Sequence, residues 1–148
     1  MKKLAVMGLT AVLAGVSMAT LAAPKPFEAI EYRQGIFKAV KWNFGPMGDM
    51  VKGKTEFNAA EFSRRADNLA ALSKMPLEGF IPGTYASKTA ALPAIESEWD
   101  TFAKGMETFA ANSAALADAA KGGDMNAIRP AFMKVAQSCK GCHDNFKD

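Results

Sequence analysis

Near the C-terminus, the residues Cys139-Lys140-Gly141-Cys142-His143 have the types and the spacing of a cofactor attachment site. A Cys-x-x-Cys-His segment attaches a c-type haem: its two thiols add across the haem vinyl groups as thioethers, and its histidine binds the iron in one axial position. On an α-helix, which turns by about 100° per residue, Cys142 lies roughly 60° and His143 roughly 40° from Cys139. All three side chains therefore project from one helix face, and His143 is the only histidine of the chain.

The two cysteines have a second possible chemistry, because a Cys-x-x-Cys pair in an exported protein can form a redox disulfide. Such a pair normally begins a helix that follows a strand. Here the pair lies at the end of the chain, and His143 follows it directly. The sequence therefore favours one covalent haem c attached through Cys139 and Cys142, with His143 as the metal ligand.

The N-terminus indicates the compartment. Residues 1–22 have a positively charged start with two lysines, an apolar stretch that ends at about Val16, and small residues before a cleavage position after Ala22. These are the parts of a secretory signal peptide, so we expect export to the periplasm and one domain over residues 23–148. An uncleaved membrane anchor is the alternative, but the apolar stretch is short for a membrane span.

The charge of the chain says little about partners. The formal net charge is +3, and cleavage after Ala22 would remove two lysines and no acidic residue. The chain has no basic block and no nucleic-acid-binding signature. We therefore expect neither a nucleic acid nor, after cleavage, a membrane as a partner.

Four segments show helical periodicity, and none shows the alternation of a strand. The first covers about Phe27–Lys52, where Gly45-Pro46 interrupts the pattern and Pro46 is expected to kink the helix. The second helix is expected to have its N-cap at Asn58 and to stop before Pro76. The third is expected to start near Pro93 and to stop at Gly122. The fourth is expected to have its N-cap at Asp124, and Pro130 either delays its start or distorts its first turns. A long loop, 75–92, separates the second helix from the third.

The apolar residues of the last helix place the cysteines in the fold. Phe132, Val135, Cys139, Cys142 and Phe146 follow each other in steps of three and four, which is the spacing of a helix-bundle seam. The attached haem must then face the bundle interior. The sequence predicts an all-α protein, an antiparallel four-helix bundle that encloses one covalent haem c.

The sixth coordination position of the iron separates two functions. With no second histidine, methionine is the strongest remaining ligand, and it would make a six-coordinate low-spin electron carrier. Met47 and Met50, which follow the Gly-Pro interruption, are the candidates for this ligand. Met106 and Met133 lie on or beside helical seams and are expected to be packing residues.

An enzymatic role is not expected. Peroxidase chemistry usually needs a distal acid or base, and the sequence has no second histidine to supply one.

The chain resembles cytochrome c′, of the class II c-type cytochromes. The resemblance covers nearly all of the chain outside residues 1–22, and the haem motif close to the C-terminus is specific to this class. The matching segments are Tyr32-Arg33-Gln34, Val51-Lys52-Gly53, Phe80-x-Pro82-Gly83-Thr84 and Cys139-Lys140-Gly141-Cys142-His143-Asp144.

The resemblance implies a homodimer with one haem per subunit and five-coordinate, high-spin iron. It also implies binding of the diatomic gases NO and CO and a link to nitric oxide protection or electron transfer. The redox partner is not implied.

The resemblance also assigns roles to residues of the first helix. Arg33 and Gln34 would contact the haem near its propionates. Low-spin relatives have a methionine three residues after the position of Gln34, where this chain has Phe37. Phe37, which periodicity alone would call a core aromatic, is therefore expected over the distal face, with the iron five-coordinate.

Two further positions carry weaker expectations. Lys147 stands where the family usually has an arginine near the proximal haem face. Trp42 is either a packing residue or part of a subunit contact.

Overall fold

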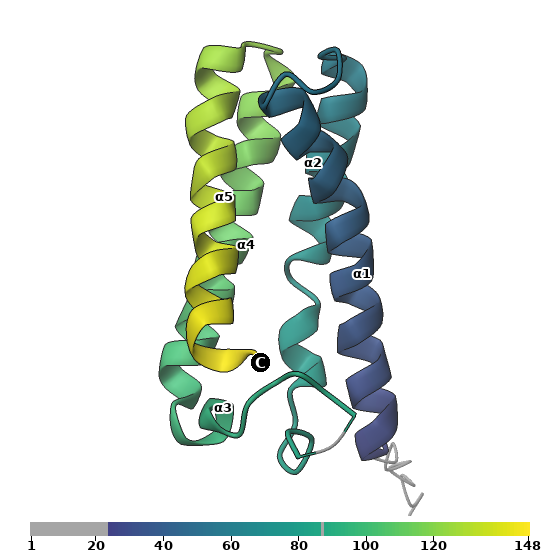
Figure 1. Ribbon diagram of the computed structural model, residues 1–148, viewed down its shortest axis with the longest axis vertical. Coiled ribbons are helices and arrows are strands. Elements are labelled where there is room, and N and C mark those ends of the chain that lie inside the picture. The colour runs from purple at the N-terminus through teal and green to yellow at the C-terminus, as the bar shows by residue number, and fades with distance from the viewer. Residues whose placement is uncertain (1–23, 87) are drawn as a thin grey trace, which may run out of the picture.

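The computed structural model describes residues 24–86 and 88–148, and four long helices dominate it (Figure 1). The helical elements are α1 (Pro26–Val51), α2 (Ala59–Leu72), the short 3₁₀ helix η1 (Pro76–Gly79), α3 (Ala94–Ser97), α4 (Trp99–Lys121) and α5 (Met125–Phe146). The all-α antiparallel four-helix bundle predicted from the sequence is confirmed. The predicted signal peptide, residues 1–22, lies outside the described residues.

Two of the helix starts are set by the capping residues that the sequence indicates. The Asn58 side chain accepts a hydrogen bond from the backbone N–H of Glu61 at the start of α2. The Asp124 carboxylate accepts one from the backbone N–H of Asn126 at the start of α5. Side chains of this kind satisfy backbone donors that have no partner within the helix.

Two expectations about helix continuity need correction, and a third stays a prediction. α1 runs from Pro26 to Val51 as one helix with Pro46 inside it, as expected, and the kink at Pro46 stays a prediction. α5 begins at Met125 although Pro130 lies within it, so a delayed start is wrong. The third predicted helix is two elements, because Glu98 adopts a non-helical backbone (φ −120°, ψ 36°) between α3 and α4.

A side chain from α2 explains how α1 tolerates its proline. Pro46 has no N–H to donate to the carbonyl of Trp42 four residues earlier. The Arg65 guanidinium donates to that carbonyl instead, at 2.9 Å. The carbonyl that Pro46 leaves free is therefore paired, and the helix does not have to end there.

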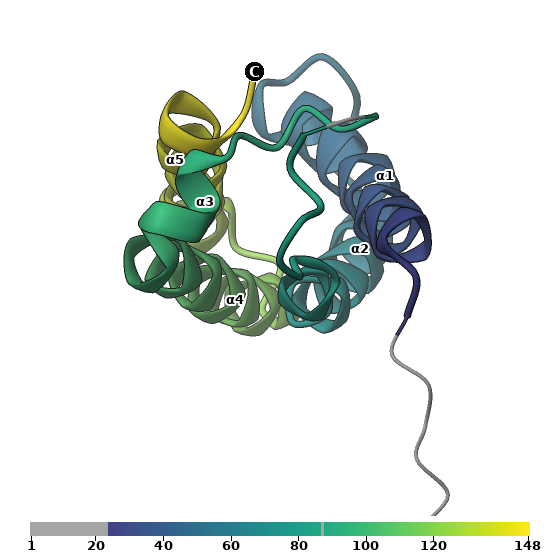
Figure 2. The ribbon, with the colours of Figure 1, turned by 90° about the horizontal axis from the view of Figure 1, so that it is seen from below.

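The long helices that follow each other along the chain pack side by side, and α1 and α5 lie next to each other and complete the ring (Figure 2). α1 packs on α2, α2 on α4, and α4 on α5, whereas α1 and α5 touch each other sparingly. Their clearest contact is the ring of Phe44 stacked on that of Phe132, with centroids 4.4 Å apart. Gly48 lies beside the same ring, and a Cβ at Gly48 would come within 3.3 Å of it.

The long predicted loop contains η1 and then crosses one end of the bundle. We call its residues 80–86 and 88–92 the strap. The strap passes between the α1 side and the α5 side and runs beside the C-terminus. Ala91 forms an isolated antiparallel bridge with Lys147, and the backbone N–H of Leu92 donates to the carbonyl of Phe146 at 3.0 Å. The strap therefore ties the start of the chain's helical part to its end.

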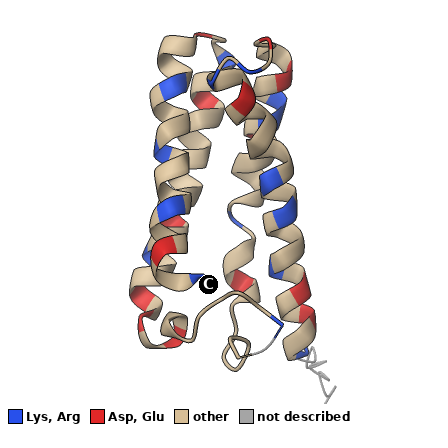
Figure 3. Ribbon diagram, in the orientation of Figure 1, with Lys and Arg blue, Asp and Glu red and all other residues tan. Residues whose placement is uncertain are grey.

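Charged residues of both signs are spread over the helices in the described part of the chain (Figure 3). Among the described residues, no helix combines the length and the apolar character that a membrane span requires.

Candidate haem-binding site

The predicted attachment residues lie on the last turns of α5, beside the apolar core. Cys139 and Cys142 are free thiols, and both are partly buried against the core cluster. Burial raises the pKa of both thiols, and the nearby Cys139 raises the pKa of Cys142 further. Both cysteines are therefore neutral thiols at pH 7, and both pack against apolar residues of the core.

His143 is the most exposed of the three attachment residues. Partial burial of the imidazole lowers the pKa of His143, and the charge of Lys147 lowers it further, while Asp144 opposes the shift. The lowered pKa favours the neutral imidazole, which is the form that binds a metal.

Arg33 is a buried cation that holds the strap. Its side chain is 2% exposed and donates to the carbonyl of Gly79 at 3.0 Å and to the hydroxyl and carbonyl of Thr84 at 2.7 and 2.6 Å. A fourth bond reaches the hydroxyl of Thr89 at 3.1 Å. Its guanidinium carbon also lies 4.6 Å from the centre of the Phe80 ring. Burial lowers the pKa of Arg33, but a guanidinium stays protonated in proteins.

These contacts give Arg33 a structural role beside the expected one. A guanidinium has five N–H donors. Of the four bonds that its two terminal nitrogens make, three go to the strap and one goes to the carbonyl of Gly79 in η1. The Nε–H is not used in these four bonds, so a propionate that took two donors of Arg33 would compete with its present acceptors. Contact of Arg33 with haem stays a prediction.

Gln34 also reaches the strap. Its amide donates to the carbonyl of Lys88 at 3.0 Å, on the exposed side of α1. Thr84 and Thr89 are the strap residues that sequence reasoning missed as partners of α1. Their only signal was a pair of hydroxyl residues in a loop that is otherwise rich in glycine and proline.

Phe37 lies at the same height in the bundle as the first cysteine. Phe44 and Phe132 mark one level of the antiparallel pair α1 and α5. Phe37 precedes Phe44 by seven residues and Cys139 follows Phe132 by seven, and each step moves about 10 Å along the axis in the same direction. The structure therefore places Phe37 and Cys139 on facing helices at one level.

An aromatic row crosses the bundle at this end. The rings of Phe37 and Phe80 meet edge to face with centroids 6.3 Å apart, Phe80 lies 4.7 Å from Phe102, and Phe102 lies 5.3 Å from Phe146. The row connects α1, the strap, α4 and α5. Phe80 and Phe102 were not predicted as site residues.

The two candidate methionine ligands lie elsewhere. Met47 is fully buried and Met50 is 9% exposed, both in the core. By the same register, Met47 lies about 20 Å along the bundle axis from His143. Bonds between protein ligands and metals are on the order of 2 Å long, so one metal ion cannot reach both residues.

The residues present fit a covalent haem. Two thiols three residues apart and an imidazole on the same helix end form the donor set. The two thiols pack against a core that includes the rings of Phe80, Phe102 and Phe146. An apolar macrocycle buries well against such side chains, and thiols supply the attachment points.

Comparison with known proteins agrees with this geometry. The family model described as Cytochrome C' matches residues 28–147. The chain belongs to the cytochrome c′ family. Cytochrome c′ of Halomonas halodenitrificans is 41% identical over 129 residues, which cover 83% of this chain and 98% of that protein.

Solved structures of the family superpose closely on this chain. Cytochrome c prime from Shewanella frigidimarina has a TM-score of 0.84 and 51% identity, and covers 86% of this chain and 99% of its own. An Alcaligenes xylosoxidans cytochrome c′ variant with bound NO has a TM-score of 0.78, 35% identity, and coverage of 84% and 98%. A glycine variant of the same protein with bound carbon monoxide has a TM-score of 0.77, 35% identity, and coverage of 84% and 97%.

Membership of the cytochrome c′ family establishes the cofactor class. Proteins of this family bind haem c covalently, and this chain carries the two cysteines that the attachment needs. Its relatives include proteins whose structures hold NO and CO.

Proposed function

We propose that this protein is a periplasmic cytochrome c′ that binds NO and CO at five-coordinate, high-spin iron, with His143 as the axial ligand. The observation that carries the proposal is the level of Phe37 opposite Cys139, on the facing helix. When bound through Cys139 and Cys142, the haem supplies an iron with one open position for a diatomic ligand. Phe37 has no atom that can bind a metal, so it leaves that position free.

The buried environment supports gas ligands over other molecules. Phe37 and Phe80 form an apolar wall that cannot hydrogen-bond to a bound ligand, and their bulk leaves room only for small molecules. NO and CO need no proton and no charge partner, whereas activation of peroxide needs a distal acid or base. Arg33, the nearest buried cation, is already hydrogen-bonded to the strap. These features support ligand binding rather than catalysis.

The alternative, a six-coordinate electron carrier with a methionine ligand, has less support. Met47 and Met50 are buried in the core two or more helical turns from the level of Cys139 and Phe37. Electron transfer by five-coordinate iron stays compatible with the proposal.

Visible spectra of the ferric and ferrous haem protein, with and without CO and NO, test the proposal. We expect high-spin spectra in both states and a ferrous spectrum that changes on addition of either gas. The paired variants Met47→Leu and Met50→Leu should leave the spectra unchanged, because neither sulfur reaches the iron. A low-spin spectrum that does not respond to CO, or one that becomes high-spin in either variant, would contradict the proposal.

We also propose export and self-association. Residues 1–22 have the parts of a signal peptide, so fractionation of expressing cells should recover a shortened chain, without residues 1–22, in the periplasm.

For self-association, Trp42 is 75% exposed on the outer face of α1, beside a shallow hollow lined by Lys38, Lys41 and Pro46. An exposed tryptophan in such a setting favours a protein contact, and a second copy of the chain is the partner we propose.

A further inference from the structure

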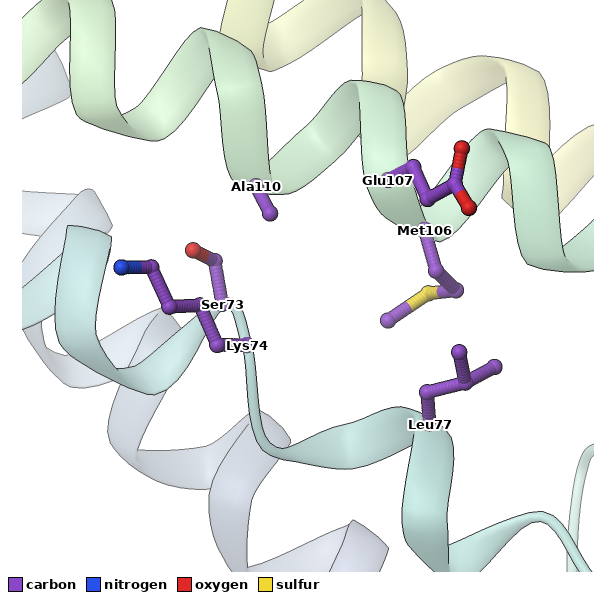
Figure 4. Close-up of a pocket in the computed structure, with 6 residues that line it drawn as sticks. All are labelled: Ser73, Lys74, Leu77, Met106, Glu107 and Ala110. Atoms are coloured by element: carbon purple, nitrogen blue, oxygen red, sulfur yellow. The ribbon is translucent and has the colours of Figure 1, made fainter.

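A small crevice opens between η1 and α4, on a side of the bundle that the sequence did not single out. It has a volume of about 220 Å³ and is bounded by the end of α2, by η1 and by the middle of α4 (Figure 4). Its lining residues are Ser73, Lys74, Leu77, Met106, Glu107 and Ala110.

The inner part of the crevice is apolar. Met106 points toward Leu77 across the opening, and Ala110 lies one turn further along α4 (Figure 4). The Ser73 hydroxyl is already used, because it donates to the carbonyl of Ala70 at 2.9 Å. The exposed Glu107 pairs with Lys104 at the surface. A crevice with such a lining suits a small apolar molecule that makes no hydrogen bonds.

Met106 connects the crevice to the core that contains the aromatic row. Met106 is 5% exposed and belongs to the same buried core as Phe80 and Phe102. Phe102 lies one helical turn before Met106, and it contacts Phe80, which in turn contacts Phe37. Met106 and the rings of Phe102, Phe80 and Phe37 therefore belong to one packed core.

We infer that NO and CO pass from solvent through this crevice into the bundle interior beside Phe37, and that Met106 is the gate of this route. The inference rests on the proposed function. Methionine is unbranched and flexible, so Met106 can change rotamer and admit a diatomic molecule without displacement of a helix. The apolar side chains of Leu77, Met106 and Ala110 in the crevice disfavour the entry of ions.

The other hollow at the surface does not compete for this role. It has a volume of about 280 Å³, but its lining residues Lys38, Lys41, Trp42 and Pro46 lie on the outer face of α1. None of the four belongs to the buried core cluster, so this hollow does not lead inward.

The test uses the haem-loaded protein and two matched variants on α4. Ala110→Phe fills the crevice, and Ala114→Phe makes the same change at another partly buried position one turn further from Phe102. Flash photolysis and stopped flow then give the association and dissociation rates of CO. A route acts on the barrier in both directions, so Ala110→Phe should slow both rates by about tenfold or more. The dissociation constant should stay unchanged, and Ala114→Phe should behave like the unmodified protein.

Two results would overturn the inference. One is CO association at the original rate in Ala110→Phe, and the other is a change in its dissociation constant with an unchanged dissociation rate. Either result leaves the proposed function standing, whereas failure of the unmodified protein to bind CO contradicts the proposed function itself. Crystals under xenon pressure give a readout that needs no ligand on the iron. Xenon should occupy the space between Leu77 and Met106, and an empty crevice there would also overturn the inference.

Discussion

Arg33 donates hydrogen bonds to both oxygen atoms of Thr84, fifty-one residues further along the chain. This contact joins the middle of α1 to the strap that closes one end of the bundle. It also uses a cation that is buried without a carboxylate among its hydrogen-bond partners in the described part of the chain. Three acceptors of the strap, the carbonyl of Gly79 and two aromatic rings stabilise the charge in place of an anion.

Replacement of Arg33 should loosen the strap. Arg33→Lys keeps the charge but loses the planar fork that serves Gly79, Thr84 and Thr89 together. Buried acceptors would then lack partners, and we expect the free energy of unfolding to fall by about 1–3 kcal/mol, measured by urea denaturation. Gln34→Ala removes one exposed hydrogen bond and should change stability by less than about 0.5 kcal/mol. Equal losses in the two variants would refute the role of Arg33 as the main attachment of the strap.

A side chain at Gly79 should force η1 away from α1. A Cβ there would lie 2.9 Å from Cδ1 of Tyr32, 3.0 Å from the Cβ of Arg33 and 3.1 Å from the carbonyl oxygen of Ala29. Two of these three atoms lie on or next to the α1 backbone and cannot turn aside, so Gly79→Ala should destabilise the protein by about 1–3 kcal/mol. Thermal unfolding followed by circular dichroism measures the loss.

Gly105→Ala is the matched control for that change. Gly105 lies within α4, and its Cβ would meet nothing within 4 Å. Alanine at a helical position without a clash is favoured over glycine by about 0.5–1 kcal/mol. The control should therefore raise the melting temperature while Gly79→Ala lowers it. A neutral Gly79→Ala variant would show that η1 can shift at no cost.

A methionine at position 37 should convert the iron to six coordination. Phe37→Met places a thioether at the level of Cys139, and we expect a low-spin spectrum together with weaker CO binding. Phe44→Met is the control, because residue 44 lies two turns away and contacts Phe132 instead. Absorption spectra of the ferric and ferrous forms decide the outcome. A high-spin spectrum and unchanged CO affinity in Phe37→Met would mean that Phe37 does not lie above the iron.

Charge at position 42 should prevent self-association. Trp42→Lys replaces an exposed aromatic side chain beside Lys38 and Lys41, so two copies would bring several like charges together. Sedimentation equilibrium should show a dimer for the unmodified protein and a monomer for this variant. Met133→Lys, at a side chain that is 51% exposed on α5, should remain a dimer. Loss of the dimer in Met133→Lys alone would move the contact from α1 to α5.

Much of the candidate site could be read from residue order because its chemistry is local. Cys139, Cys142 and His143 share one face of a helix for reasons of helical geometry alone. The two cysteines pack against the core, whereas His143 lies at the surface. The helix caps at Asn58 and Asp124 are local too, since each side chain bonds a backbone N–H within three residues. The four-helix fold followed from the periodicity of four amphipathic segments.

Tertiary contacts decided the remainder, because the partners lie far apart in the chain. Pro46 stays inside α1 because Arg65 from another helix pairs the carbonyl that the proline leaves free. Arg33 is committed to the strap because Thr84 folds back over it, which no local pattern encodes. The stacking of Phe44 on Phe132 sets the register of α1 against α5. That register, and not the presence of methionines in the sequence, puts Phe37 opposite Cys139 and keeps Met47 away from His143.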